Sequence, residues 1–409
     1  MFHVPSAAMA NNQIAVTAAA FVGFTGFTLA MPFLALYIQQ LGVTDTGDVA
    51  LWTGATLGVT PAITALCAPF WGRVGDRFGN AVLVQRSLLS GVVVLVLMAV
   101  ATHPWQLFAL RAVQGFVAGY GPITLVMAAM SAPPDRMAQA IGTVQTAQRM
   151  APAIAPVIGG VLASAVGLRN VFFVAAAVYA LASVLMAVLY REPPRPAAAG
   201  GQPDRVPFRN ILAFENFLVL MAVIFGLQLV DKSFGPVLVL YLGQLGHGAD
   251  RAAVLAGTLF SVLAFSAALG NQLAGALLKR VTARAVIDGA VLLAAGALAL
   301  VAFRDETWVL AGAMSIFGAS VGTAMTTAYT AAGSVMPRHV HGTGFGFLGG
   351  ASLMATAFSP MLSGLVAARS IRVVFFSGVV TLVVLALVVR RVMVERNLAI
   401  EPAPAVDES

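Results

Sequence analysis

The stretch that decides the fold is FGLQLVDKSFGPVLVLYLGQLG, from Phe225 to Gly246. It is apolar over most of its length, yet it carries Asp231 and Lys232 near its middle, with Pro236 one turn later. An ionised side chain at the centre of a bilayer costs about 2.5–3.5 kcal/mol on insertion scales, so such a charge faces a partner or a water-filled space. The proline removes a backbone donor and disfavours a straight helix. We therefore expect a bent membrane span with a functional acid at its centre.

The second half of this stretch is present twice in the chain. MPFLALYIQQLG, residues 31–42, matches GPVLVLYLGQLG, residues 235–246, at seven of twelve positions. The offset is 204 residues, half of the chain. Further matches follow at the same spacing, including APVIGG at 155–160 with SPMLSG at 359–364. A duplicated set of membrane helices places a binding site at the interface between the repeats.

Composition predicts a membrane protein. The chain has 409 residues, of which 59% are hydrophobic and 10% charged, whereas soluble domains carry about 25% charged residues. The one cysteine, Cys67, excludes an internal disulfide. The five histidines form no intramembrane metal cluster, and no phosphate-binding glycine loop is present. We expect no metal, no cofactor and no enzymatic activity.

Twelve segments are long and apolar enough to span a bilayer, which requires about 20 residues. They cover residues 14–38, 50–71, 81–101, 105–130, 138–165, 170–190, 212–242, 252–278, 285–303, 307–334, 342–367 and 371–393.

The distribution of lysine and arginine predicts the orientation of these spans. Fifteen lie in or beside the turns after even-numbered spans and in the C-terminal tail, against five in the opposite loops. Positively charged loops stay in the cytoplasm, so both termini are expected there. This asymmetry explains the net charge of +7 without a nucleic-acid partner.

The polar break REPPRPAAAGGQPDRVPFRN, residues 191–210, is proline- and glycine-rich and lies near the midpoint of the chain, so we interpret it as a linker. We predict an all-α membrane protein of two pseudo-symmetric six-helix bundles, residues 1–190 and 211–395. A disordered cytoplasmic tail is expected over residues 396–409.

The turn after the second span reads PFWGRVGDRFGN, residues 69–80. It resembles the signature Gly-x-x-x-Asp-Arg-x-Gly of the major facilitator superfamily, and Gly72, Asp76, Arg77 and Gly79 match it. The resemblance implies a conformational latch between the two halves in the outward-facing state. The alternative is an ordinary solvated tight turn.

The fourth span contains LRAVQGFVAGYG, residues 110–121, and Arg111 and Gln114 match an Arg-x-x-Gln-Gly pattern of the same family. A buried guanidinium requires a counter-charge. The resemblance implies that Arg111 takes part in proton handling. The alternative is that Arg111 extends to the membrane interface.

The fifth span reads IGTVQTAQRMAPAIAPVIGG, residues 141–160. Gln145, Gln148 and Arg149 are three and four residues apart and share one helix face. That face is too polar for lipid, so we expect it to line the cavity.

The end of the same span resembles a pattern of the family's antiporters, and its shape is carried here by Pro152, Pro156, Gly159 and Gly160. Small residues at this spacing allow close helix contact, and the prolines bend the segment. The resemblance implies export. Ordinary helix packing is the alternative.

Across all twelve spans the chain resembles twelve-span proton-coupled drug antiporters of the bacterial multidrug-efflux type, with MPFLALY at 31–37 and APFWG at 68–72. The resemblance implies a monomer in the bacterial inner membrane, whose partners are the lipid bilayer, protons and small lipophilic or cationic substrates.

From these residues we expect proton coupling at Asp231, with Arg111 or Arg149 as its partner across the interface. The substrate cavity is expected to contain Gln114 and Lys232, the polar face of span five, and the aromatic residues Phe27, Tyr37 and Tyr241. One alternative is a purely structural ion pair at Asp231. Another is proton-coupled uptake of a sugar or organic acid, which usually needs more polar contacts than the chain offers.

Overall fold

The computed structural model describes residues 6–118, 120–132, 137–191, 214–304, 306–336 and 341–394, and these form helices without strands. The first half contains α1 (Ser6–Ala30), η1 (Met31–Phe33), α2 (Leu34–Gln40), α3 (Thr46–Phe78), α4 (Asn80–Ala99), α5 (Pro104–Val117), α6 (Tyr120–Met130), α7 (Met137–Val166) and α8 (Leu168–Leu189). The second half contains α10 (Phe217–Lys232), α11 (Phe234–Gln244), α12 (Ala249–Leu277), α13 (Ala283–Phe303), α14 (Thr307–Val335), α15 (His341–Ala367) and α16 (Ile371–Val392). The linker beyond Arg191 and the expected tail lie outside the described residues.

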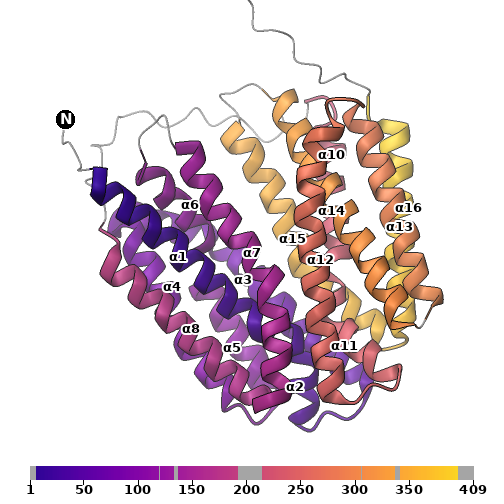
Figure 1. The fold of residues 1–409 in the computed structure, drawn as a ribbon, viewed down its shortest axis with the longest axis horizontal. Coiled ribbons are helices and arrows are strands. Elements are labelled where there is room, and N and C mark those ends of the chain that lie inside the picture. Colours follow the sequence, from indigo (N-terminus) through magenta and orange to yellow (C-terminus); the bar gives the residue numbers. More distant parts are fainter. Residues whose placement is uncertain are drawn as a thin grey trace, which may run out of the picture.

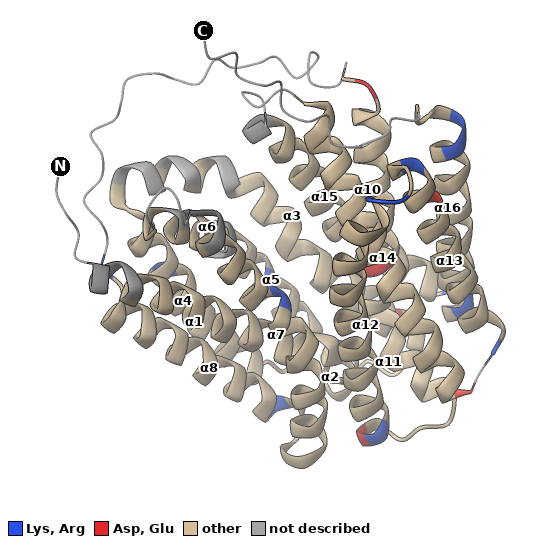
Figure 2. Ribbon diagram, turned by 45° about the horizontal axis from the view of Figure 1, so that its top comes forward, with Lys and Arg blue, Asp and Glu red and all other residues tan. Residues whose placement is uncertain are grey.

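The helices form two bundles, as predicted (Figure 1). Helices α1–α8 pack mainly with one another, as do α10–α16, and the bundles meet chiefly through α3 against α15 and α7 against α12. Figure 2 shows charged residues gathered towards the helix ends, with isolated ones along their length. This pattern suits helices whose middle sections lie in hydrocarbon.

Eleven helical segments of the described chain are long and apolar enough to cross a membrane. The expected span 105–130 is not one of them, because it is divided into α5 and α6. Helix α5 ends where Ala118 adopts an extended conformation, with ψ of 178°. The prediction of twelve crossings therefore corresponds to eleven long segments and one crossing made of two short helices.

The second span is longer than predicted. Residues 69–78 were expected in a turn, but α3 continues as helix to Phe78 and only Gly79 separates it from α4. Gly79 has a φ of 102°, which glycine adopts without steric cost. The glycine of the motif therefore forms the turn, and the residues before it belong to the last turns of a helix.

Matching prolines interrupt the first and seventh spans. Pro32 lies in the 3₁₀ segment η1 between α1 and α2, and Pro236 lies at the start of α11, just after the break at Ser233. A proline cannot donate to the carbonyl four residues earlier, which for Pro236 belongs to Lys232. The break therefore lies beside the charged residues of the span.

A side-chain clamp closes each half at the end where its first helix begins. In the first half, Asn12 Nδ2 donates to Arg191 O at 2.7 Å and Arg191 N donates to Asn12 Oδ1 at 2.9 Å. In the second, Asn216 makes the same two bonds with Val394, at 3.1 and 2.8 Å. Since Asn216 follows Asn12 by 204 residues, the clamp is a further part of the duplication.

Replacing Asn12 with alanine is expected to lower the free energy of unfolding of the first bundle by about 1–3 kcal/mol, because two backbone groups lose their partner. Thermal unfolding of the purified protein in detergent would measure this change. Asn11 is exposed, so Asn11→Ala is the matched control and should leave the transition unchanged. Equal effects of both substitutions would contradict a specific role of the clamp.

The closest contacts between the halves are also duplicated. A Cβ on Gly54 of α3 would overlap the Pro360 carbonyl oxygen of α15, and a Cβ on Gly257 of α12 would overlap the Pro156 carbonyl oxygen of α7. One turn further along, a Cβ on Gly160 would lie 2.7 Å from the Ala253 carbonyl oxygen. Small residues thus let the helix backbones touch.

The equivalent of this last contact pairs Gly364 of α15 with Ala50 of α3, at 2.5 Å. Among the described residues, every glycine whose added Cβ would lie within 3 Å of the backbone of the other half lies in the first part of α3 or α12 or in the second part of α7 or α15. The predicted packing residues Pro156 and Gly160 belong to this interface. Gly159 instead packs against the Leu29 carbonyl oxygen of its own half, and α7 continues through Pro152 as helix.

Candidate functional site

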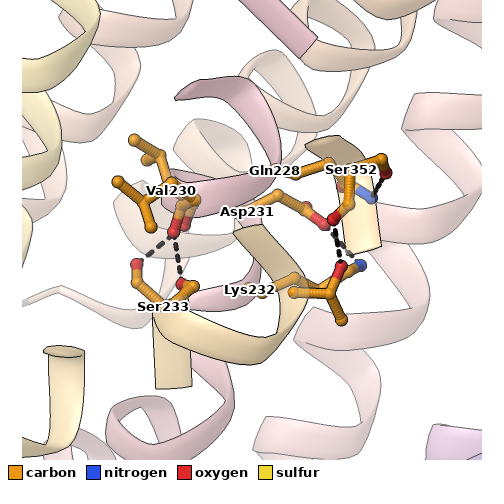
Figure 3. A network of polar contacts seen from close by, with 9 residues as sticks. Gln228, Val230, Asp231, Lys232, Ser233 and Ser352 are labelled. Carbon is orange, nitrogen blue, oxygen red and sulfur yellow. Dashed lines mark hydrogen bonds and ion pairs between the residues drawn. The ribbon is translucent and has the colours of Figure 1, made fainter. Parts of the chain in front are cut away.

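The charged pair of the seventh span lies halfway along it. Asp231 is 14 residues after Phe217 and 13 before Gln244, the two ends of the segment. Lys232 Nζ contacts Asp231 Oδ2 at 2.5 Å, as Figure 3 shows. Helix α10 ends at Lys232, so the lysine side chain extends from the break in the span.

We infer from its exposure that this pair faces a hydrated space rather than lipid. The Lys232 side chain is 44% exposed and that of Asp231 16%. A half-exposed ammonium at mid-span would be costly in hydrocarbon. Nearby, Gln228 Nε2 donates to Ser352 Oγ at 2.9 Å and connects α10 to α15 (Figure 3). The polar surface therefore continues from α10 onto a helix that contacts the other half.

The expected ion partners of Asp231 were Arg111 and Arg149, and the structure corrects this expectation. The ion pair of Asp231 is with its neighbour Lys232. Consecutive helical residues point about 100° apart, but the helix ends at Lys232 and the long side chain folds back. No described carboxylate is within ion-pair distance of either arginine.

Arg111 is fully enclosed in the first half, with 2% of its surface exposed. Its Nη1 donates to Gln114 Oε1 at 2.6 Å and its Nε donates to Thr56 O at 3.2 Å. The guanidinium also lies over the Phe27 ring, 5.4 Å from its centroid. Arg111 thus does not extend to the membrane interface. Gln114 and Phe27 contact it within the bundle.

The polar face of α7 meets the second half at Arg149. In the amide orientation that satisfies its neighbours, Asn271 of α12 donates to Thr326 Oγ1 and Gly322 O at 2.9 Å and accepts a hydrogen bond from Arg149 Nη1 at 3.3 Å. The Arg149 side chain is otherwise exposed. This contact joins the two bundles through polar groups that lie within their spans.

The two glutamines of that face differ in their surroundings. Gln145 is exposed, as a cavity residue would be, whereas Gln148 is half-buried and its Nε2 donates to Thr124 Oγ1 at 2.9 Å. Sequence reasoning overlooked Asn271 and Thr326. Their polarity within an otherwise apolar span is the signal that could have found them.

Tyr37 and Tyr241 lie in the packed interior rather than on a cavity wall, contrary to expectation. They are 0% and 1% exposed. Tyr37 Oη donates to Met98 O at 2.8 Å, and Tyr241 Oη donates to Val301 O at 3.3 Å. The two hydrogen bonds occupy equivalent positions in the two halves. Tyr37 connects α2 to α4, and Tyr241 connects α11 to α13.

The mid-span charges are not part of the repeated framework. An offset of 204 places Phe27 opposite Asp231, and an offset of 203 places Met314 opposite Arg111. The first half therefore has a buried arginine where the second half is apolar, and the second half has a carboxylate where the first has an aromatic ring. Charges that break a twofold repeat give each half a separate chemical task.

The side chains of Asp76 and Arg77 and the surroundings of Gly72 lie outside the described part of the structure, so the latch remains a prediction. Their backbone forms the last turns of α3.

Two membrane bundles of duplicated architecture, with polar and charged side chains where they meet, define a membrane transporter. A model of the Major Facilitator Superfamily matches residues 16–352, and the chain belongs to this family. A "Multidrug resistance protein MdtG" from Dickeya zeae (strain Ech586) is 30% identical over 75% of this chain and 76% of its own length. One of the same description from Proteus mirabilis (strain HI4320) is 30% identical, over 78% and 79%.

Solved structures share the fold. A bacterial homologue of the human lysosomal transporter Spinster, described as inward-facing and occupied, superposes with a TM-score of 0.76 at 18% identity, covering 96% of this chain and 98% of that one. The nucleoside transporter NupG superposes with a TM-score of 0.69 at 16% identity, covering 93% and 99%.

Proposed function

We propose that this transporter exports small lipophilic or cationic molecules in exchange for protons. The observation that carries the proposal is the half-exposed Asp231–Lys232 pair at mid-span. A carboxylate at this depth can bind a proton or a cationic group, and the two ligands compete for it. The similarity to proteins described as multidrug resistance proteins supports export of lipophilic compounds.

The glycine contacts between the halves support an alternating-access mechanism. They close the end where α3 and α12 begin, and the positive loops assign the opposite end to the cytoplasm. We therefore infer an inward-facing arrangement in the inner membrane, with both termini in the cytoplasm. Opening requires α3 to leave α15 and α7 to leave α12, so the two duplicated contacts act as one gate.

The test is transport into inverted membrane vesicles carrying the purified protein, with a pH gradient imposed across the membrane. Lipophilic cations should accumulate when the interior is acidic and should leave when the gradient is collapsed. A sugar and an organic acid serve as the comparison panel. Accumulation of a sugar with the opposite gradient dependence would indicate uptake by symport and overturn the proposal.

A further inference from the structure

A groove of about 730 Å³ lies on the outer face of the first bundle, between α4 and α8 and away from the contact between the halves. Its walls are mostly apolar and include Leu89 and Val93, which are 52% and 58% exposed. Polar side chains lie among them, including those of Gln85 and Arg86. Arg86 is six residues into α4, about 9 Å from the helix end. Helix α4 has 20 residues, so this depth is about a third of the way along it, where an arginine can draw a lipid phosphate below the bilayer surface.

Arg86 has unused hydrogen-bonding capacity. Its Nη2 donates to Val117 O at 3.0 Å and to Ser87 Oγ at 3.2 Å, and its guanidinium stacks on Trp71, 3.3 Å from the ring centroid. Its Nε and Nη1 are buried and have no hydrogen-bond partner. Gln85 Oε1 is an unpaired acceptor beside it. A partly buried cation with unpaired donors is destabilising unless an anion is supplied.

The second half shows how the duplicated position is completed. With an offset of 203, Gln85 corresponds to Asp288 and Ala187, on the groove wall, corresponds to Arg390. Arg390 Nε donates to both Asp288 carboxylate oxygens at 2.8 Å. There the chain provides a cation and its anion together. In the first half, Ala187 and Gln85 stand at these two positions, and the space that the ion pair fills in the second half is open.

We propose that this groove binds an anionic glycerophospholipid of the cytoplasmic leaflet. The phosphate accepts hydrogen bonds from Arg86, a head-group hydroxyl donates to Gln85 Oε1, and an acyl chain lies along Leu89 and Val93. Basic pockets between membrane helices on the cytoplasmic side suit anionic head groups. The inference uses the orientation proposed above and is independent of what the protein transports.

The test follows Trp71 fluorescence, because that indole stacks on Arg86. The other three tryptophans are replaced by phenylalanine, and the protein is reconstituted in phosphatidylcholine with brominated phosphatidylglycerol or brominated phosphatidylcholine as quencher. Brominated phosphatidylglycerol should quench at an about tenfold lower mole fraction, as expected for one charge-assisted contact. Equal quenching by both lipids would overturn the proposal.

Variants assign the preference to the groove. Arg86→Gln should remove the preference, whereas Arg391→Gln, at an exposed arginine near the end of α16, should retain it. The double variant Gln85→Asp with Ala187→Arg reproduces the pair of the second half, fills the groove and should also remove the preference. A preference that survives both groove variants would contradict the proposal, as would competition by soluble glycerol phosphate equal to that by the lipid. Transport is not the readout, so failure here would not bear on proton antiport.

Discussion

Replacing Asp231 with asparagine is expected to abolish proton-driven accumulation while leaving exchange of substrate between the two sides of the membrane intact. The amide has nearly the shape of the acid but neither binds a proton nor carries a charge. A gradient of one pH unit is worth about 1.4 kcal/mol per proton, so a coupled transporter accumulates substrate about tenfold per exchanged proton. In Asp231→Asn that ratio should fall to about one.

The matched control is Asp288→Asn. Asp288 also pairs with a cation in the second half, at 2.8 Å from Arg390 Nε, but it lies five residues from the start of α13 rather than at mid-span. Its loss breaks an ion pair of similar geometry without removing the acid of the proposed site. Asp288→Asn should therefore keep the gradient-driven accumulation of the unmodified protein.

The variant Lys232→Gln distinguishes a role of Asp231 in proton coupling from a purely structural role of the Asp231–Lys232 ion pair. If the pair only holds the span together, then Asp231→Asn and Lys232→Gln should lower thermal stability alike, and both should lose exchange. If Asp231 carries the proton, Lys232→Gln should still accumulate substrate. Full accumulation by Asp231→Asn would show that the proton binds elsewhere.

The membrane fold could be predicted from the sequence because hydrophobic length and the repeat at an offset of 203–204 depend on local properties of the chain. The division of the fourth span at Ala118 could not be, since an apolar run conceals a change of one ψ angle. The turn was predicted to begin at residue 69 because glycine and charged residues are typical of loops. Helix α3 instead continues through these residues to Phe78, and the turn is formed at Gly79.

The site was predicted less completely. The depth of Asp231 is a property of one helix and was found. Its partner depends on where α10 ends, because consecutive side chains point about 100° apart only in a helix that continues beyond Lys232. Tyr37 and Tyr241 were expected in the cavity because they neighbour the segments expected at the interface between the halves. Their hydroxyl groups instead bond to backbone carbonyls of α4 and α13, which no local sequence pattern reveals.

Substituting Gly257 with valine is expected to prevent the inward-facing arrangement. Even a Cβ at this position would overlap the Pro156 carbonyl oxygen, and backbone cannot rotate away as a side chain does. Overpacking of this kind costs about 1–3 kcal/mol, which shifts a two-state equilibrium about 5- to 150-fold. Gly54→Val, at the equivalent contact with Pro360, should have the same effect.

The change can be measured as a distance between spin labels placed in pairs across α7 and α12, in a background where Cys67 is replaced by serine. Both variants should lengthen that distance at the end where α12 begins, and both should slow transport because closure of the gate is lost. Gly312 of α14 is the matched control, since a Cβ there meets no atom within 4 Å. Gly312→Val should leave the distance unchanged.

The duplication provides a further test. If the contacts of α3 with α15 and of α7 with α12 form one gate, a substitution at either contact should open both. Opening of α7 from α12 in Gly54→Val, whose substitution lies at the other contact, would show that the bundles move as rigid bodies. Lengthening only at the substituted contact would instead indicate that each helix pair separates independently, and the proposal that the two contacts act as one gate would be wrong.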